Sequence, residues 1–412
     1  MGGYAWAMLR LIVWALLLVA GIGGDSRAGP DLRVFDSEHY EIRSDAEPDT
    51  VREIAAHMDL IFEDYARRFR EFRVRDSRAF PLWVFETRED YLVFLAEQGF
   101  NGQGTGGVFF RGRDGAGLAT FLESRPIDTV LGTLRHEGLH QFAYARISQH
   151  LPPWLNEGMA EFFNHAIVTE GAIDPGVVDP GALHRVVSSI ESGAYLPMET
   201  LLTLTAESWG DRLRAGGPAS RAMYDQSWAV VHFMINAERG RFEPLLLELL
   251  REAARGQADL RIPEKFGVDL TPMEEAWKRY IRDAEPEPVL VAVERLSVMA
   301  WVMKTLVEAG ERPLSLDALR EAVAEREFSG RYPSASGVRD VNAEEDWWLE
   351  LPEGDRQRKA RLVVKNTASG VGLPSMEVHG LEHVVSVQWV DSEPGYRVVV
   401  QDKRARRRSS SR

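Results

Sequence analysis

Apolar residues recur at helical spacing in three stretches of the first half of the chain. Residues 48–73, 127–147 and 154–167 carry apolar side chains three and four positions apart, which is typical of amphipathic helices. A Ser-x-Pro start signal precedes the second stretch, and a Pro-Pro pair at 152–153 separates it from the third. The pattern therefore predicts two successive helices joined by a short break.

Short runs of apolar, aromatic and β-branched residues predict strands around these helices. Residues 33–47 alternate apolar and polar positions, residues 80–86 form a compact apolar run, and residues 107–123 are typical of a hairpin-like pair. The Gly-rich stretch 101–107 lacks the Gly-Lys-Ser/Thr ending of a phosphate-binding loop, so we interpret it as a flexible turn.

The predicted secondary structure changes twice in the second half of the chain. Residues 178–283 are mostly helical in pattern, and helical patterns resume over 289–327. From about residue 342 the sequence becomes rich in valine and alternates in the manner of strands. The predicted fold class is therefore α+β: a small mixed sheet with the two central helices and a helical subdomain, then a helical segment and a small antiparallel β module.

These changes in the sequence pattern define the expected domain organisation. The Glu-Pro-Glu-Pro run that ends the long helical region is a poor helix interior and indicates a boundary. We expect a signal peptide over 1–28, a main domain over 29–285, a helical linker over 286–341, a β module over 342–402 and a basic disordered tail over 403–412.

The first 28 residues have the features of an export signal. A short amino-terminal region ends at Arg10, and an apolar run follows from Leu11 to Ile22, shorter than the roughly 20 residues that span a bilayer. Small residues at Ser26 and Ala28 suit cleavage after Ala28. We expect a secreted or periplasmic protein, and the alternative is an uncleaved signal anchor that tethers it to the membrane.

Composition excludes several kinds of chemistry. The chain of 412 residues is 44% hydrophobic and contains no cysteine, which excludes disulfides, thiolate metal ligands and a thiol nucleophile. The net charge is −14, although residues 403–412 carry six positive charges. Such an acidic body is poorly suited to nucleic acid, and only the tail could make weak contact with an anionic surface.

The central helix carries the motif His136-Glu137-Gly138-Leu139-His140. Residues four apart lie on one helix face, so the two imidazoles can converge on one metal ion. Glu137 projects from an adjacent part of the helix, where it can reach a water molecule beside that ion.

Glu157 follows His140 by sixteen residues and lies on the next predicted helix. Two antiparallel helices joined by a tight turn would bring its carboxylate to the same ion, and two histidines with one carboxylate form the ligand set of catalytic zinc sites. The alternative is that the histidines are ordinary core residues, which requires the HEGLH and WLNEG segments to coincide by accident. A purely structural zinc site would leave Glu137 without a purpose.

HEGLH followed by PPWLNEGMAEFF resembles the gluzincin clan of metallopeptidases, and in particular the exported peptidase-MA-like proteins of the domain-of-unknown-function 1570 (DUF1570) type. The resemblance implies a zincin fold for the main domain. It also implies that His136, His140 and Glu157 bind Zn²⁺ and that Glu137 is the general base.

Two further roles are implied by the same resemblance. Glu161 lies four residues after Glu157, where thermolysin-like enzymes place an acidic residue that supports a zinc-binding histidine. Tyr224 opens a segment similar to one whose tyrosine stabilises the oxyanion in M1 aminopeptidases, although Gln226 and Ser227 replace its lysine and glycine. Packing roles are the alternative for both residues.

The resemblance is strong over 127–165, loose over 33–285 and absent from 290–412. M1 aminopeptidases place an acidic residue, which binds the substrate's free amine, on a strand before the motif. The corresponding residues here, 106–110, contain no acid. An edge strand at this place could still hold an extended peptide by backbone pairing.

The sequence thus predicts an exported zinc metallopeptidase-like hydrolase that acts on a peptide or protein substrate. The alternative is a non-catalytic protein that binds peptides or the cell envelope through a gluzincin domain. We interpret His150, His165 and His184 as ordinary surface or packing residues, and His232 as a residue of the core or of a cleft wall.

Overall fold

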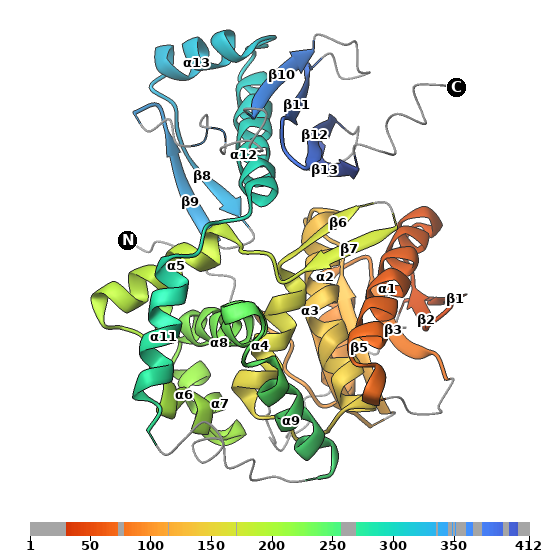
Figure 1. Cartoon of the computed structure of the whole chain (residues 1–412). Coiled ribbons are helices and arrows are strands. Elements are labelled where there is room, and N and C mark those ends of the chain that lie inside the picture. Colours follow the sequence, from red (N-terminus) through yellow and green to blue (C-terminus); the bar gives the residue numbers. More distant parts are fainter. Residues whose placement is uncertain are drawn as a thin grey trace. The chain divides into compact units, whose positions relative to one another are not determined.

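The computed structural model describes residues 30–402, apart from 73–77, 114, 170, 257–268, 335–336, 345–347, 349–350, 352–359, 366–372 and 390–394. The predicted signal peptide and basic tail lie outside these residues. Within them the chain forms two compact units, one of residues 30–165 and 183–284 and the other of residues 166–182 and 285–402. The fold is mixed, with helices and several small sheets, which confirms the predicted class (Figure 1).

A five-stranded mixed sheet organises the first unit. Its strands are ordered β1-β2-β3-β5-β4, with β1 Arg33–Asp36, β2 Tyr40–Ser44, β3 Phe80–Phe85, β4 Gly107–Gly112 and β5 Gly115–Phe121. The pairs β2–β3 and β3–β5 are parallel, whereas β1–β2 and β4–β5 are antiparallel. The prediction of one strand over 33–47 was wrong, because the chain reverses after Asp36, where the Ser37 amide bonds to the Tyr40 carbonyl.

Helices cover both faces of this sheet. Alternate residues of a strand face opposite sides. Phe80 of β3 faces α1 (Pro48–Arg68), where it packs on Phe62, and Phe62 also contacts Phe142 of α3 (Ile127–Arg146). Phe85 of β3 faces α2 (Arg88–Glu97), where it contacts Phe94. The motif helix α3 therefore lies on the sheet, next to β4 and β5.

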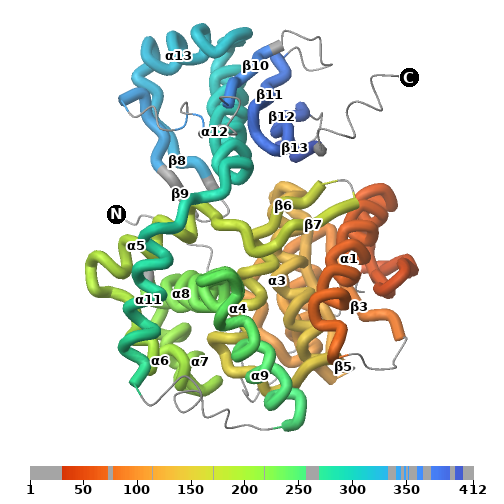
Figure 2. Tube along the Cα trace, viewed as in Figure 1, coloured from red at the N-terminus to blue at the C-terminus, as the bar shows by residue number. Residues whose placement is uncertain are grey.

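A helical group completes the first unit and is built around the pair α4 (Pro153–Asn164) and α8 (Pro218–Asn236) (Figure 2). These two helices approach closely because Gly158 has no side chain: a Cβ there would lie 2.5 Å from the backbone carbonyl oxygen of Ser227. The other helices are the 183–192 part of α5 (Pro180–Ser192), α6 (Met198–Thr203), α7 (Ala206–Ala215), α9 (Glu243–Ala254) and α11 (Thr271–Arg282), with 3₁₀ turns at Arg70–Phe72 and Ala237–Arg239.

Two helices have ends that differ from the sequence pattern. The prediction over 154–167 was wrong at its end, because His165 leaves helical geometry and the β-branched residues after it form a strand. Within the mostly helical stretch predicted over 178–283, α8 runs from Pro218 to Asn236, and the α-helical geometry does not continue to Glu238, which adopts a positive φ of 50°.

The second unit contains a four-stranded antiparallel sheet, ordered β10-β11-β12-β13, that packs on helix α12. The helical pattern over 289–327 is interrupted after Glu308, so it forms two helices rather than one continuous stretch. The elements are β6 Ala166–Thr169, β7 Ala172–Pro175, α12 Pro288–Glu308, α13 Leu316–Glu325, β8 Ser329–Ser334, β9 Gly337–Asn342, β10 Arg361–Lys365, β11 Ser375–His379, β12 His383–Trp389 and β13 Tyr396–Asp402.

The β6–β7 hairpin belongs to this second unit although it follows α4 in the sequence. Ile167 of β6 is buried with Val298 and Met299 of α12, and the amide of Glu287 donates a 2.8 Å bond to the carbonyl of Val178. Across the part of the chain that the structure describes, no helix has both the length and the apolar character needed to cross a membrane.

Candidate metal centre

Helix α3 brings the two motif histidines together. His136 and His140 are one helical turn apart on the buried side of α3, with relative exposures of 1% and 4%. Their Nε2 atoms lie 3.1 Å apart. The expected convergence of both imidazoles on one point is therefore present in the structure.

Helix α4 supplies the third side chain. Pro153 occupies the first turn of α4, where its missing N–H is of no cost, so the helix begins immediately after the break. Glu157 is buried on the next turn, and its Oε2 lies 3.3 Å from His136 Nε2 and 3.4 Å from His140 Nε2. The three residues that the sequence predicted as ligands thus meet in one cluster.

The separations within this cluster suit a tetrahedral metal ion. Zinc ligands lie about 2.0–2.1 Å from the ion, so two ligand atoms of an ideal tetrahedron are separated by about 3.3–3.4 Å. The three observed separations, 3.1, 3.3 and 3.4 Å, are close to this value. The buried group of His136, His140 and Glu157 could therefore hold a metal ion.

Electrostatics also favour positive charge at this point. Burial by itself lowers the pKa of His140, but the carboxylate of Glu157 opposes it and raises that pKa to about 9. Burial raises the pKa of Glu157, but the positive charge of His140 and the contacts with His136 lower it to about 2. The carboxylate therefore stays ionised and attracts a cation, either a proton on His140 or a metal ion.

Glu137 lies beside the cluster but is not part of it. Its side chain is buried, with 4% exposure, and its Oε2 accepts a 2.9 Å hydrogen bond from the backbone amide of Phe109 in β4. The edge strand of the sheet thus holds the carboxylate that the sequence predicts as the general base. The sequence analysis did not predict this contact, because a backbone amide is the same for nearly every residue type and leaves no pattern in the sequence.

Glu161 lies behind His136. Its Oε1 is 3.5 Å from His136 Nδ1, on the ring side away from the cluster, and its Oε2 accepts a 2.8 Å bond from Asn164 Nδ2. His165 Nε2 lies 3.6 Å from the same Oε2. Glu161 is therefore placed to orient the His136 ring, and His165, which we interpreted as an ordinary packing residue, adjoins this contact.

Tyr224 of α8 approaches the cluster from another side. Its ring centroid lies 6.4 Å from that of His136, and its side chain is 3% exposed. Burial raises the pKa of Tyr224 well above 10.0, and the negative charges of Glu157, Glu137 and Glu161 raise it further. The phenol is therefore protonated at neutral pH, as a hydrogen-bond donor must be.

The rest of the site depends on contacts that join distant parts of the chain. Tyr65 of α1 donates a 2.5 Å bond to the carbonyl of Arg135, the residue before His136. Arg135 Nη2 in turn donates to the carbonyl of Asn164 at 3.2 Å, which ties α3 to the end of α4. No spacing rule could have revealed these residues, because each contact requires the tertiary packing.

Comparison with protein-family models matched residues 130–256 to a family described as "Protein of unknown function (DUF1570)". The matched segment contains the three cluster residues as well as Glu137 and Tyr224, and it supports the DUF1570 part of the resemblance. Comparisons with curated proteins and with solved structures gave no match.

Proposed function

We propose that the chain is a zinc-dependent hydrolase of peptide bonds, of the gluzincin type. The observation that carries this proposal is the combination of the His136, His140 and Glu157 cluster with a fourth buried group, Glu137, that lies beside it. Simple metal storage or structural binding does not require that fourth carboxylate.

The donor set supports zinc as the ion. Two imidazoles and one carboxylate are the protein ligands of many catalytic zinc sites, which keep one further position open. When bound, the ion supplies Lewis acidity, which lowers the pKa of water and polarises a substrate carbonyl.

Glu137 would serve as the general base. The Phe109 amide bonds to one carboxylate oxygen and leaves the other available to accept a proton from the attacking water. Glu137 would then deliver that proton to the leaving amine of the cleaved peptide bond. Because β4 holds the carboxylate, its position does not depend on α3 alone.

Tyr224 would donate a hydrogen bond to the negatively charged oxygen that develops on the substrate. Its raised pKa keeps the proton on the phenol, and its burial keeps competing water away. Glu161 would keep His136 in one ring orientation and tautomer through its contact with Nδ1.

The position of β4 supports a peptide as substrate. Within the described strands β4 pairs only with β5, so an extended chain would pair along its other edge, where the Phe109 amide already bonds to Glu137. The amino-terminal sequence supports export, so we propose that the substrate is met outside the cytoplasm.

Substitution of the base tests the proposal directly. Glu137→Gln should retain about one zinc ion per chain and should lose roughly 10²–10⁴ in hydrolysis rate, because only the proton transfer is removed. Metal content and digestion of a mixed peptide library, with and without a chelator, provide the two measurements. Glu97→Gln, an exposed change on α2, is the matched control.

Two results would contradict the proposal in different ways. Hydrolysis by Glu137→Gln at the wild-type rate would refute the role of the base. A wild-type protein that binds zinc and peptides but cleaves none of them would instead favour the alternative, a non-catalytic peptide- or envelope-binding protein.

A further inference from the structure

Helix α7 places a buried tryptophan against Tyr224. Trp209 is 5% exposed, and its ring centroid lies 5.7 Å from that of Tyr224, with an angle of 77° between the two ring planes. In this edge contact the indole N–H of Trp209 donates a hydrogen bond to the phenol oxygen of Tyr224. Neither the sequence motif nor the family match assigns a role to Trp209.

Local contacts fix the position of α7. Its first turn is capped in both directions, because the Thr205 hydroxyl accepts a bond from the Ser208 amide at 3.2 Å and Ser208 Oγ accepts one from the Thr205 amide at 2.9 Å. At its other end Gly216 and Gly217 adopt φ values of 69° and 82°, which favour glycine, and α8 begins at the next residue. Trp209 therefore projects from a short, capped helix that a tight turn joins to the helix of Tyr224.

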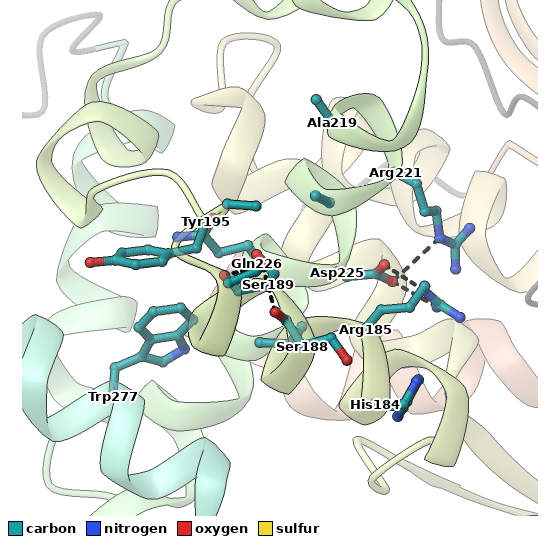
Figure 3. Close-up of a pocket in the computed structure, with 14 residues that line it drawn as sticks. His184, Arg185, Ser188, Ser189, Tyr195, Ala219, Arg221, Asp225, Gln226 and Trp277 are labelled. Atoms are coloured by element: carbon teal, nitrogen blue, oxygen red, sulfur yellow. Dashed lines mark hydrogen bonds and ion pairs between the residues drawn. The ribbon is translucent and has the colours of Figure 1, made fainter.

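The residues that follow Tyr224 hold α8 on another side of the helix. Asp225 is 2% exposed and accepts bonds from Arg185 Nε and Nη2 at 2.7 and 2.8 Å (Figure 3). Gln226 bonds to both the amide and the carbonyl of Leu196, at 2.9 and 2.6 Å. The backbone at Tyr224 is thus held in place, and the direction of its hydroxyl depends on the contacts of the phenol itself.

The bond from Trp209 restricts where the phenol proton can point. An indole N–H can only donate, so it occupies an acceptor position of the phenol oxygen and the proton must point elsewhere. The negative charges of Glu137, Glu157 and Glu161 act on the same phenol and attract its proton towards the cluster. An oxygen that accepts one hydrogen bond also donates a stronger one, because linked hydrogen bonds polarise each other.

We propose that Trp209 is a positioning residue, whose indole N–H directs the Tyr224 hydroxyl towards the metal cluster and strengthens the bond that this hydroxyl donates to the substrate oxyanion. The inference rests on the proposed function, because the oxyanion forms only during the proposed hydrolysis. Trp209 supplies no ligand atom to the cluster and acts through Tyr224.

NMR spectroscopy of the full chain, with isotope-labelled tryptophan, tests the contact without any need for hydrolysis. The chain contains eleven tryptophans, and the indole resonance of Trp209 is the one that Trp209→Phe removes. In Tyr224→Phe this resonance should move upfield, and its hydrogen exchange should become roughly threefold to tenfold faster, because the acceptor oxygen is lost. A Tyr224→Phe spectrum in which no indole resonance moves would refute the contact, even without the assignment.

A double-mutant cycle tests the effect on catalysis. Trp209→Phe should lower kcat roughly threefold to tenfold at unchanged KM and zinc content, because the hydroxyl loses its fixed direction and only the transition state depends on it. The same change in the Tyr224→Phe background should have no effect, because the hydroxyl on which it acts is absent. Trp277→Phe should leave kcat unchanged and is the matched control. Trp277 is buried on α11 of the same unit, and its indole N–H has no hydrogen-bond acceptor among the described residues.

The outcomes separate this inference from the proposed function. An equal loss of kcat in both backgrounds would show that Trp209 only supports the fold, and it would overturn the proposal. A loss confined to KM or to zinc content would also overturn it. A wild-type protein that cleaves no peptide would instead refute the proposed hydrolysis, and the indole resonance would still decide whether Trp209 holds the Tyr224 hydroxyl.

Discussion

Zinc should stabilise the fold through the α3–α4 cluster, and Glu157→Gln should remove most of that stabilisation. The three ligand atoms come from two different helices, so an ion bound among them links α3 to α4 only in the folded chain. A ligand present at about 1,000 times its Kd stabilises the native state by about 4.1 kcal/mol. For a unit of this size, 1 kcal/mol corresponds to about 2–4 °C in Tm, so we expect a rise of roughly 8–16 °C.

Glu157→Gln retains the size of the side chain but removes its negative charge. Loss of an outer-shell partner costs about 10–100-fold in metal affinity, so loss of a direct ligand should cost at least roughly 100-fold. At the same zinc concentration the ion is then at about 10 times its Kd and stabilises the variant by only about 1.4 kcal/mol. The expected rise in Tm falls to roughly 3–6 °C.

Scanning calorimetry of chelator-treated protein, with and without added zinc, measures both values. Glu97→Gln should show the full wild-type rise, because its side chain is exposed on α2 and remote in sequence from the cluster. A wild-type protein whose Tm does not respond to zinc would refute the metal centre. Equal rises for wild type and Glu157→Gln would show that zinc binds elsewhere.

Three further predictions follow from the same geometry. The zinc-induced rise in Tm should be small at pH 6 and should grow towards pH 9. The reason is that His140, whose pKa is raised from 6.5 to about 9, must lose a proton to bind the ion. A rise that stays constant in calorimetry over a pH series would contradict this. Without zinc the sign reverses: the contribution of the charged His140 to stability is present below pH 6.5 and is lost as the pH rises through about 9. Tyr224→Phe should lower kcat by roughly 10²–10³ at unchanged zinc content, and an unchanged kcat would exclude its role at the oxyanion. Gly158→Ala should destabilise the fold by about 1–3 kcal/mol in urea denaturation and lower zinc retention, because its Cβ would press on the Ser227 carbonyl and displace α4. Gly210→Ala is the matched control, because Gly210 is also helical and an added Cβ there would meet only the flexible end of the Arg214 side chain.

The metal cluster could be predicted from the sequence because its information is local. His136 and His140 are one helical turn apart, and the Pro-Pro break places Glu157 on the immediately following helix. Helical spacing and one short connection are therefore enough to bring the three side chains together. The amphipathic patterns of α1, α3 and α12 were predictable for the same reason.

The parts of the fold that the sequence did not reveal depend on distant partners. The strand after α4 has only four residues, and it is stabilised by pairing with β7 and by burial of Ile167 against α12, more than 120 residues later. When only residues 154–167 are considered, the apolar residues of this strand match the end of the preceding helix. The hydrogen bond from the Phe109 amide to Glu137 could not be predicted for a related reason. It forms because the order of strands in the sheet places β4 beside α3, and that order is a property of the tertiary fold.

Helix α8 shows why one set of contacts could be predicted and another could not. Tyr224 and Asp225 are consecutive, so their side chains leave the helix about 100° apart and face different surroundings. Tyr224 meets the cluster on α3 and α4, whose residues form a motif, whereas Asp225 meets Arg185 of α5 across forty positions of unpatterned sequence. One helix thus contacts both the metal cluster and Arg185, and only the cluster, whose three residues are close in sequence, leaves a pattern that can be recognised without the structure.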